Sequence, residues 1–473
     1  MLKSGMTSPW RTRHQAPARP ASVQARKLLV QLVRISNARA ARTDLSALSC
    51  RRDACSLDCA RSSAPPSRRL LSLMSTRQIS VRMRPSAALA AATIMSLPLG
   101  SIYAFSVLLV PLEQLFQASR SELAAVFGIS AVFFTIGANL APRLFGWIRA
   151  PLLVALTGAL SCAGVALAAV APSLSWLILG YGVLFATGGG MAYVVVQQCV
   201  NTAPLARPGL VNGYLVGLFP LGAMLAAPAF GLGLDRVGVR LTLAGLAAAI
   251  GTAAFAATAL VAHAGVVLAS PTPSTAGSQH RLRATFWKLF TIFFLAASAG
   301  LMVLSQAAGM VAAFGAGKSA SVLATTGITG AIAAARVLGG WLIDRLPVPY
   351  VAASAQAIAL SGAIALTVMP SPAMAILTLG SIGVGYGLIS GVTAGAVAAY
   401  WPKVEFGRIA SRTYIAWCLA AISLPVLAGH LYDLTGGYET AVIVAGGANL
   451  LAVLVALTLP RQSAPGNGRR QPI

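Results

Sequence analysis

The sequence predicts an all-α membrane protein of twelve transmembrane helices, arranged as two parallel repeats of six helices. Three observations support this prediction. Charged residues are 10% and hydrophobic residues 57% of the 473 residues, whereas soluble domains average roughly 25% charged residues. Twelve stretches of mostly apolar residues are long enough to cross a bilayer as helices. Short patterns recur at a nearly constant offset between the first six stretches and the last six.

The first 84 residues differ from the rest of the chain. They hold 17 of the 35 Lys and Arg residues against three acidic residues, and they are rich in Arg, Ser and Ala. Such a composition cannot bury enough apolar surface to fold alone, so residues 1–84 are expected to be a disordered basic tail. The tail is acid-poor like a transit peptide. An over-extended start, with Met74 or Met83 as the true initiator, is an equally simple interpretation.

The same tail contains a run of cysteines, Cys50, Cys55 and Cys59, with a spacing compatible with metal binding. No histidine follows them within the tail, so we expect no metal and no cofactor. The net charge of +25 would suggest nucleic acid, but it is divided between the tail and the loops, and the tail has one aromatic residue, Trp10. We therefore expect no nucleic-acid partner, and a lipid bilayer around the chain.

A polar segment separates the sixth apolar stretch from the seventh and is rich in Pro, Ser and basic residues. It divides the chain into an N-terminal half (85–269), a cytoplasmic linker (270–284), a C-terminal half (285–460) and a cytoplasmic tail (461–473). The predicted stretches are residues 87–112, 123–140, 151–170, 174–200, 210–230, 241–262, 286–310, 320–343, 351–368, 374–400, 413–431 and 440–459.

Basic residues between the stretches predict the orientation, because loops rich in Lys and Arg stay in the cytoplasm. Outside the tail, thirteen Lys and Arg residues fall on the side of the two termini and four on the other side. An even number of helices places both termini on one side. We therefore expect both termini in the cytoplasm, in a bacterial inner (plasma) membrane, and a chain that functions as a monomer.

Internal repeats indicate how the helices are organised. A pattern of Gly, three residues, Asp, two residues and Gly begins at Gly231 and again at Gly429, 198 residues later. Leu-Gly pairs open the fourth and tenth stretches at an offset of 200, and Arg143 stands where Asp344 stands at an offset of 201. Three agreeing offsets indicate two six-helix halves in parallel orientation. Halves of this kind form a binding site near the midplane and rock around it.

The end of the eighth stretch resembles a signature of the major facilitator superfamily, R-x2-G-G-x3-D-R. The first stretch, with Tyr103 in GSIYAF, and the end of the eleventh, from Pro425, resemble the oxalate/formate antiporter and monocarboxylate transporter branches. The resemblance covers residues 87–460 and implies the major facilitator fold and the transport of small organic anions by alternating access. The residues that match the signature include Arg336 and the motif-loop residues Gly340, Asp344 and Arg345.

Three positions depart from these branches. Monocarboxylate transporters carry a Lys two residues after their Tyr-Ala-Phe-like triplet, where this chain has Val107, and an Asp one turn before the eighth-helix Arg, where it has Ile332. Oxalate carriers add a Lys in the eleventh helix, where this chain has Trp417. A bound anion would therefore meet a single cation, and the chain lacks the Lys/Asp pair that the resemblance would require for proton coupling.

Arg336 is the one basic residue well inside a stretch, about six positions or ~9 Å from its cytoplasmic end. A charge at that depth is costly and usually functional, and its guanidinium fork matches a carboxylate. The alternatives are that Arg336 snorkels to the surface or holds Asp344 in the motif loop. We predict that Arg336 binds the substrate, helped by aromatic and amide side chains that orient a small anion: Tyr103, Trp417, Tyr414, Tyr386 and Gln306.

No buried carboxylate is expected to carry protons, so the sequence favours an antiporter that exchanges one anion for another. Two other functions stay open. A drug or proton efflux carrier of the same fold would require a buried acid in the first or fourth stretch, and a non-transporting receptor or scaffold would not require Arg336. An enzyme is not expected, because the sequence has no cluster of metal-ligating histidines, nucleophile elbow or phosphate loop.

Overall fold

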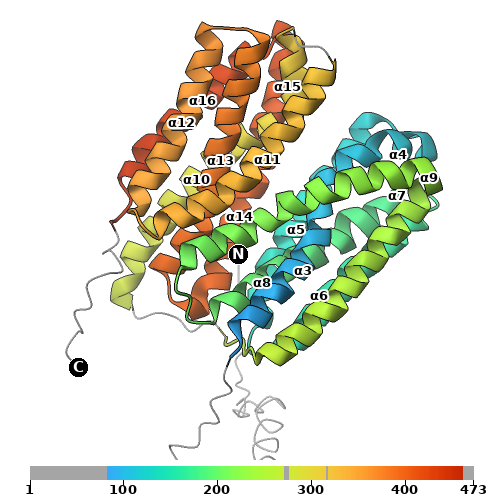
Figure 1. Cartoon of the computed structure of the whole chain (residues 1–473), viewed down its shortest axis with the longest axis vertical. Helices are drawn as coiled ribbons and strands as arrows, with labels where there is room; N and C mark the ends of the chain where they lie inside the picture. Colours follow the sequence, from blue (N-terminus) through green and yellow to red (C-terminus); the bar gives the residue numbers. More distant parts are fainter. Residues whose placement is uncertain (1–82, 271–275, 316–317, 462–473) are drawn as a thin grey trace, which may run out of the picture. The chain divides into compact units, whose positions relative to one another are not determined.

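The computed structural model describes residues 83–270, 276–315 and 318–461 (Figure 1). The chain divides into Met1–Ile79 and Ser80–Ile473, and all of the described residues belong to the second unit. The predictions for the basic tail with its cysteines, and for residues 462–473, lie outside the described residues.

Helices build both halves of the described unit. The N-terminal half contains α3 (Pro85–Leu99), η1 (Gly100–Leu108), α4 (Leu109–Phe116), α5 (Arg120–Leu140), η2 (Ala141–Leu144), α6 (Ala150–Ala169), α7 (Leu174–Leu177), η3 (Ile178–Phe185), α8 (Ala186–Asn201) and α9 (Pro208–Ala264). The C-terminal half contains α10 (Ala276–Ala313), α11 (Lys318–Ile343), α12 (Val348–Val368), α13 (Pro372–Tyr400), η4 (Lys403–Glu405), α14 (Phe406–Ile422), α15 (Leu424–Thr435) and α16 (Glu439–Leu457).

Eleven helical segments in the described ranges are long and apolar enough to cross a membrane. One of them, α9, has 57 residues and consists of two arms, because the backbone leaves the helical region at Gly238 with φ 79°. Only glycine adopts that conformation readily, which explains why a glycine stands at the turn. The two arms are the predicted fifth and sixth stretches, so the eleven segments contain the twelve predicted crossings.

Two predicted boundaries differ from the structure. The segment predicted as a linker, residues 270–284, is helical from Ala276 onward as the beginning of α10. Hydropathy marks where a helix enters the bilayer, whereas the backbone hydrogen bonds of α10 begin earlier. The eleventh stretch was predicted as one helix but is divided into α14 and α15 at Ser423 (φ −94°, ψ −92°). Pro425 has no backbone N–H to donate to the carbonyl of Ala421, and in a continuous helix its ring would clash with that carbonyl, which explains the break.

The first and fourth crossings are not α-helical throughout. Residues of η1 wind as a 3₁₀-helix for nine residues, and residues of η3 wind as a π-helix for eight. Long runs of either winding are uncommon and often mark functional segments. Tyr103, one of the predicted site residues, lies in η1.

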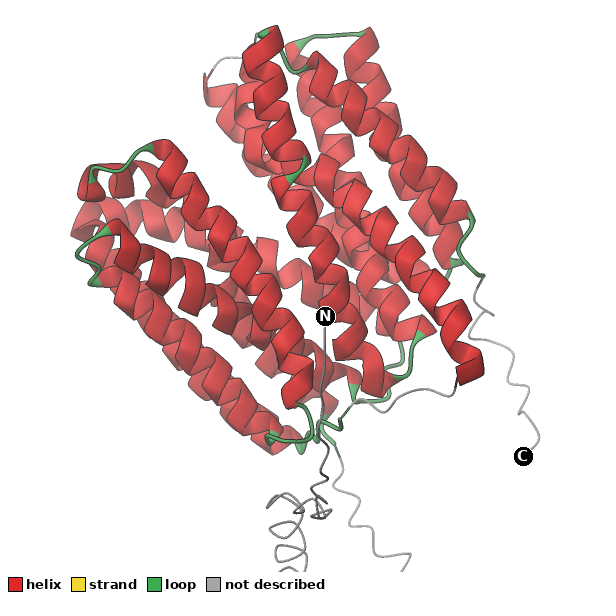
Figure 2. Ribbon diagram, turned by 180° about the vertical axis from the view of Figure 1, so that it is seen from behind, coloured by secondary structure: helices red, strands yellow, loops and turns green. Residues whose placement is uncertain are grey.

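Buried apolar residues form two cores, one in each half. The first core extends from Ala87 to Leu268, and the second from Leu289 to Leu459 with Ala131 of α5 added. The side chains of Tyr103 and Tyr414 pack against both cores. Figure 2 shows the helices of the unit gathered into these two groups.

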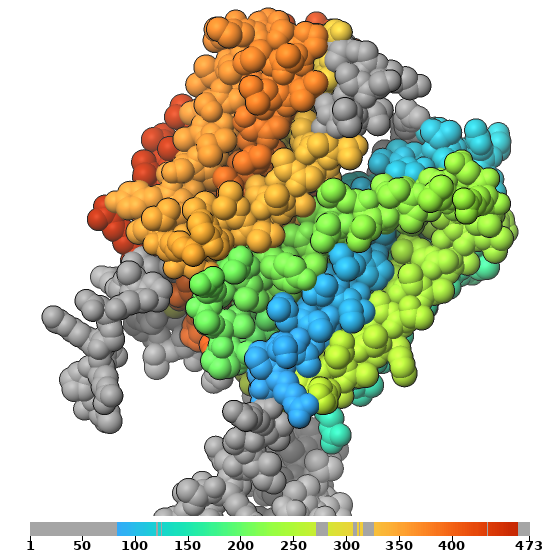
Figure 3. Space-filling model, viewed as in Figure 1, coloured from blue at the N-terminus to red at the C-terminus, as the bar shows by residue number. Residues whose placement is uncertain are grey.

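The halves meet along two lines of helices. On one, α9 packs against α11 and α13; on the other, α14 packs against α5 and α8. In Figure 3 the first arm of α9 (green) lies directly against α11 (yellow to orange). We call the end of the bundle where α3 begins and α16 ends the terminus side.

Candidate functional site

A cavity lies between the two halves, and we call it the central cavity. Its lining comes from both sides of the interface, as expected for a site around which two halves move. The N-terminal half contributes Tyr103, Phe134, Tyr193, Val216 and Phe219. The C-terminal half contributes Phe293, Arg336, Tyr386, Ser390, Tyr414 and Trp417.

Arg336 of α11 is the charged residue of this lining, and it is 4% exposed. Its Nη1 donates a hydrogen bond to the backbone oxygen of Val216 at 3.1 Å, across the interface between the halves. Its Nη2 donates to the hydroxyl of Tyr386 at 3.1 Å, and its guanidinium carbon lies 5.3 Å from the centre of the Tyr386 ring. The buried Nε of Arg336 has no hydrogen-bond partner within the described part of the chain.

Among the described residues, no carboxylate pairs with Arg336. Asp344 instead accepts hydrogen bonds from the backbone N–H groups of Gly209 at 2.7 Å and Leu210 at 2.8 Å. Arg336 therefore neither snorkels to the surface nor holds Asp344, the two alternatives that the sequence left open. Its positive charge is balanced by the dipoles of a backbone carbonyl and of tyrosine hydroxyls, which leaves a strong site for an anion.

Tyrosine hydroxyls and aromatic rings complete the cavity. The Tyr386 oxygen accepts a second hydrogen bond, from the indole Nε1 of Trp417 at 3.2 Å. Since that oxygen accepts two bonds, the Tyr386 proton is left to donate to a ligand. Tyr193 and Tyr414 are hydrogen-bonded to each other through their hydroxyls, and this bond also crosses the interface. The ring of Tyr103 stands edge-on to that of Trp417, with centroids 6.0 Å apart.

The structure brings five of the six predicted side chains to one place. Arg336, Tyr103, Trp417, Tyr414 and Tyr386 all line the central cavity. The sixth residue, Gln306, lies on α10, and its side chain is outside the described part of the structure.

Sequence reasoning missed several lining residues, and two of them carried a signal. Val216 and Phe219 lie 198 residues before Tyr414 and Trp417, which is the offset of the repeated Gly-Asp-Gly pattern. Applying that offset to the predicted residues would have found both. Tyr193 had no comparable signal, because its repeat counterpart is not aromatic.

The motif-loop residues lie on the terminus side, away from the cavity. Gly340 marks a close crossing of α11 and α9, since a Cβ at this position would lie 2.2 Å from the backbone oxygen of Gly209. Arg345 stacks on the ring of Trp341, with 3.8 Å between the guanidinium carbon and the ring centre. Asp344 holds the first turn of α9 through its two hydrogen bonds from backbone N–H groups. The loop therefore joins the C-terminal half to the N-terminal half.

The prediction that no carboxylate is buried is wrong for Glu405. This residue of η4 is 4% exposed and forms an ion pair with Arg408 at 2.9 Å. Pairing with a cation lowers the free energy of burying a carboxylate, which hydropathy alone does not register. Glu405 does not line the central cavity. The described residues contain no group of His, Cys, Asp and Glu side chains able to hold a metal ion.

Comparisons with known proteins agree on the fold. The family profile described as Major Facilitator Superfamily matches residues 289–472. Monocarboxylate transporter 13 of Rattus norvegicus is 28% identical over 398 residues, which cover 77% of this chain and 86% of the rat protein. The proton:xylose symporter XylE bound to 6-bromo-6-deoxy-D-glucose superimposes with a TM-score of 0.61 at 15% identity, covering 80% of this chain and 96% of XylE. FucP in its outward conformation gives a TM-score of 0.61 at 14% identity, covering 80% and 99%.

Proposed function

We propose that this chain is a transporter of the major facilitator superfamily that carries small organic anions with one carboxylate, by alternating access and in exchange for another anion. The observation that carries the proposal is the state of Arg336. Its side chain is a buried cation between the halves, and among the described residues it has no carboxylate partner and no hydrogen-bond partner for Nε.

The energetics of Arg336 favour an anionic ligand. A cation in the middle of a span costs about 2.5–3.5 kcal/mol on insertion scales. A carboxylate would neutralise that charge and could receive two parallel N–H bonds from the guanidinium. The proton of Tyr386 and the hydroxyl of Tyr103 supply neutral donors at the same cavity. A ligand with a second carboxylate would meet no second cation in this lining.

The position of Arg336 links binding to movement. It belongs to the C-terminal half but donates to the Val216 carbonyl of the N-terminal half. An anion that takes over guanidinium donors competes with this contact between the halves. Substrate binding can thus change the free-energy difference between the two arrangements of the halves, which alternating access requires.

Exchange is favoured over proton symport by the residues that the cavity lacks. The described residues of its lining include no carboxylate or histidine that could carry a proton. The positions where monocarboxylate transporters hold Lys and Asp are the part-buried Val107 and the buried Ile332. Without a bound anion the positive charge of Arg336 is not neutralised. We therefore expect the anion-bound transporter to switch between the two arrangements of its halves faster than the empty transporter.

We further propose that the terminus side faces the cytoplasm of a bacterial cell, as the distribution of Lys and Arg predicts. Both halves of a single chain contribute side chains to the lining of the cavity. We therefore propose that the monomer transports.

The test is counterflow of labelled formate, lactate, pyruvate or oxalate into proteoliposomes. We expect counterflow for a monocarboxylate with the wild type, and a loss of roughly 100-fold for Arg336→Ala, because two or more charge-assisted hydrogen bonds of about 1.5–3 kcal/mol each disappear. Arg149→Ala is the matched control, since Arg149 is exposed on the terminus side.

Two results would overturn parts of the proposal. Counterflow that survives Arg336→Ala unchanged would remove Arg336 from the site, and the absence of counterflow for every anion would favour a drug carrier or a receptor. Accumulation that requires a pH gradient and shows no counterflow would replace antiport with proton symport.

A further inference from the structure

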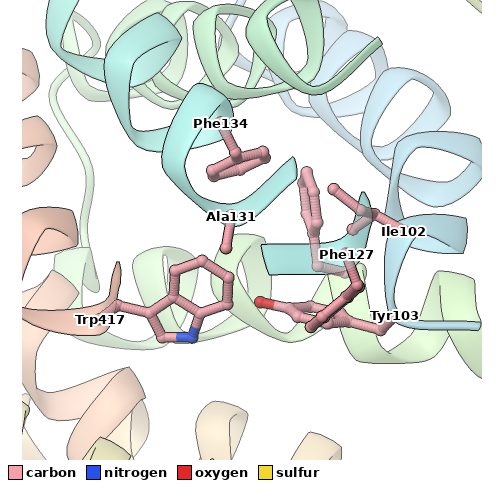
Figure 4. Close-up of a pocket in the computed structure, with 7 residues that line it drawn as sticks. Ile102, Tyr103, Phe127, Ala131, Phe134 and Trp417 are labelled. Atoms are coloured by element: carbon pink, nitrogen blue, oxygen red, sulfur yellow. The ribbon is translucent and has the colours of Figure 1, made fainter. Parts of the chain in front are cut away.

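The two halves pack together where α5 meets α14, and we call this line of contact the α5–α14 seam. Its inner side borders the cavity, where Figure 4 shows Ala131 of α5 facing the ring of Trp417 of α14. Nearer the terminus side, the side-chain Nδ2 of Asn139 donates to the backbone oxygen of Ser411 at 3.0 Å. This hydrogen bond fixes which residues of the two helices lie side by side.

The outer side of the seam is apolar and exposed on both helices. Exposed residues recur every three or four positions, so they form one stripe along each helix. Each stripe adjoins the seam, because Leu140 directly follows Asn139 and the exposed Arg412 directly follows Ser411. The stripes are Val132, Ile136 and Leu140 on α5, and Ile415, Leu419 and Ile422 on α14.

Both stripes end in an exposed arginine toward the terminus side. Arg143 follows Leu140 by three residues, and Arg412 precedes Ile415 by three. Arg143 is four residues from Asn139, and Arg412 is one residue from Ser411, so both lie within about 6–8 Å of the hydrogen bond along the helix axes. The two halves therefore each place one cation at the same end of the seam.

These two charges are not neutralised by the described part of the protein. Neither Arg143 nor Arg412 forms an ion pair there. Glu405 lies at the start of α14, but it is buried and paired with Arg408 at 2.9 Å, one turn before Arg412. Since Glu405 and Arg408 balance each other, two positive charges remain at this end of the seam.

The equivalent seam, between α9 and α11, has different chemistry at the same positions. The repeat offsets of 201 and 198 pair Arg143 with Asp344 and Arg412 with Tyr214. Asp344 supplies an anion that accepts two backbone N–H bonds from the opposite half. A general preference for basic loops on one side of the membrane does not distinguish the two seams. At the α5–α14 seam the protein supplies the cations, so the matching anion comes from outside the chain.

From this arrangement we infer that the outer side of the α5–α14 seam binds a phospholipid with an anionic headgroup. Phosphate oxygens accept hydrogen bonds from the guanidinium groups of Arg143 and Arg412, one from each half. The acyl chains lie along the two apolar stripes. The bound lipid stabilises the contact between the halves on the terminus side, as Asp344 does at the other seam. This inference goes beyond the proposed function and does not depend on which solute is carried.

The test compares nanodiscs of phosphatidylcholine alone with nanodiscs that also contain phosphatidylglycerol. The readout is the reaction rate of a thiol reagent with a cysteine introduced at Ala203, in a variant without native cysteines. Ala203 is buried next to the seam, and its backbone oxygen accepts a hydrogen bond from Nζ of Lys403 at 2.9 Å. Attraction to an anionic lipid surface is worth about fivefold in equilibrium constant for each nearby cation. We expect phosphatidylglycerol to slow the reaction at least fivefold.

Variants assign the effect to the seam. The double variant Arg143→Gln/Arg412→Gln should lose the slowing, and it should retain less phosphatidylglycerol than wild type in native mass spectrometry. Arg143→Lys/Arg412→Lys keeps both charges and should keep most of the slowing. Arg149→Gln is the matched control, since Arg149 is exposed on the terminus side at the start of α6, which does not pack against α14. In phosphatidylcholine alone, all of these variants should match the wild type.

Three results would overturn the inference. The first is equal reactivity of the cysteine in the two lipid mixtures. The second is slowing that survives Arg143→Gln/Arg412→Gln, which would assign it to the charge of the whole membrane surface. The third is equal slowing by inorganic phosphate in phosphatidylcholine nanodiscs, which would assign the site to free phosphate. None of these results bears on counterflow, so the proposed function would stand or fall separately.

Discussion

Two helix starts on the terminus side occupy equivalent places in the repeat but are held by different chemistry. Gly209 at the start of α9 and Gly407 at the start of α14 are separated by 198 residues, the repeat offset. Each donates its backbone N–H to a side chain of the opposite half. Gly209 donates to the carboxylate of Asp344 at 2.7 Å, and Gly407 donates to the amide oxygen of Gln198 at 2.6 Å.

The difference shows that both halves of the repeat have the same contact geometry, a helix start that donates a backbone N–H across the interface, while the accepting residue differs. The counterpart of Asp344 in the N-terminal half is Arg143, and a cation cannot accept hydrogen bonds from a helix N-terminus. Gln198 of α8 performs the role instead, and its Nε2 also donates to the backbone oxygen of Lys403 at 2.8 Å. A carboxylate interacts favourably with the helix dipole and forms charge-assisted bonds, whereas an amide does not. We therefore expect the α9 contact to be the stronger of the two.

Removing the carboxylate should have the largest effect. Asp344→Ala leaves the N–H groups of Gly209 and Leu210 without acceptors, and bonds to a charged group contribute about 1.5–3 kcal/mol each. We expect counterflow to fall at least tenfold. A second readout is a cysteine introduced at the buried Ala203 in a variant without native cysteines. With Asp344→Ala added, this cysteine should react with a thiol reagent from the terminus side faster than it does when Asp344 is present.

Asp344→Asn makes this contact resemble the one at α14. The counterflow rate of Asp344→Asn should therefore lie between the rates of wild type and Asp344→Ala. In liposomes of phosphatidylcholine alone, the exposed Arg143→Ala serves as a control and should match the wild type. Equal counterflow in Asp344→Ala and wild type would mean that the α9 contact does not hold the terminus side closed.

The glycines should respond unequally to a methyl group. A Cβ on Gly209 would lie 2.3 Å from the backbone oxygen of Gly340, whereas a Cβ on Gly407 would meet ring carbons of Phe145 and the Gln198 oxygen at 2.7 Å and 2.9 Å. Backbone atoms cannot move as easily as the ends of side chains. Gly209→Ala should therefore destabilise the packing of the two halves on the terminus side by about 1–3 kcal/mol, and Gly407→Ala should destabilise it less. Reactivity of the cysteine at position 203 measures both. A larger effect from Gly407→Ala would reverse the comparison.

Replacing the amide should have the smallest effect. Gln198→Ala removes one neutral acceptor and one neutral donor, each worth about 0.5–1.5 kcal/mol. Lys403 still donates through Nζ to the backbone oxygen of Ala203 at 2.9 Å, so the two halves remain joined near α14. We expect counterflow to fall a few-fold. A loss as large as that of Asp344→Ala would show that charge contributes nothing to the difference between the contacts.

Hydropathy and the repeat offsets predicted the helices, their number and the interface between the halves, because these depend on long averages along the chain. The same averages missed features that depend on single residues. Pro425 divides the eleventh crossing, and Glu405 is buried because Arg408 pairs with it. Glu405 lies between two predicted stretches, and a single proline changes the mean hydropathy of the eleventh stretch little.

The candidate site was predictable where a residue was chemically unusual for its surroundings. Arg336 stood out as a charge within an apolar stretch, and Tyr103 followed from the resemblance. Tyr193 and Phe134 are ordinary residues in apolar helices, and only the packing of the helices brings them to the cavity. That Gln198 and Asp344 perform equivalent roles was also invisible, since the two residues do not align in the repeat.

The central claim is that Arg336 is the counter-ion of a bound carboxylate. Calorimetric titration of the purified protein with acetate and phenylacetate tests this claim most directly. The comparison includes wild type, Arg336→Lys, Arg336→Gln and the exposed control Arg149→Gln. We predict binding to wild type and control, binding weakened roughly tenfold for Arg336→Lys, which keeps the charge but loses the fork, and no binding to Arg336→Gln. Binding of either carboxylate to Arg336→Gln with wild-type affinity would contradict the claim.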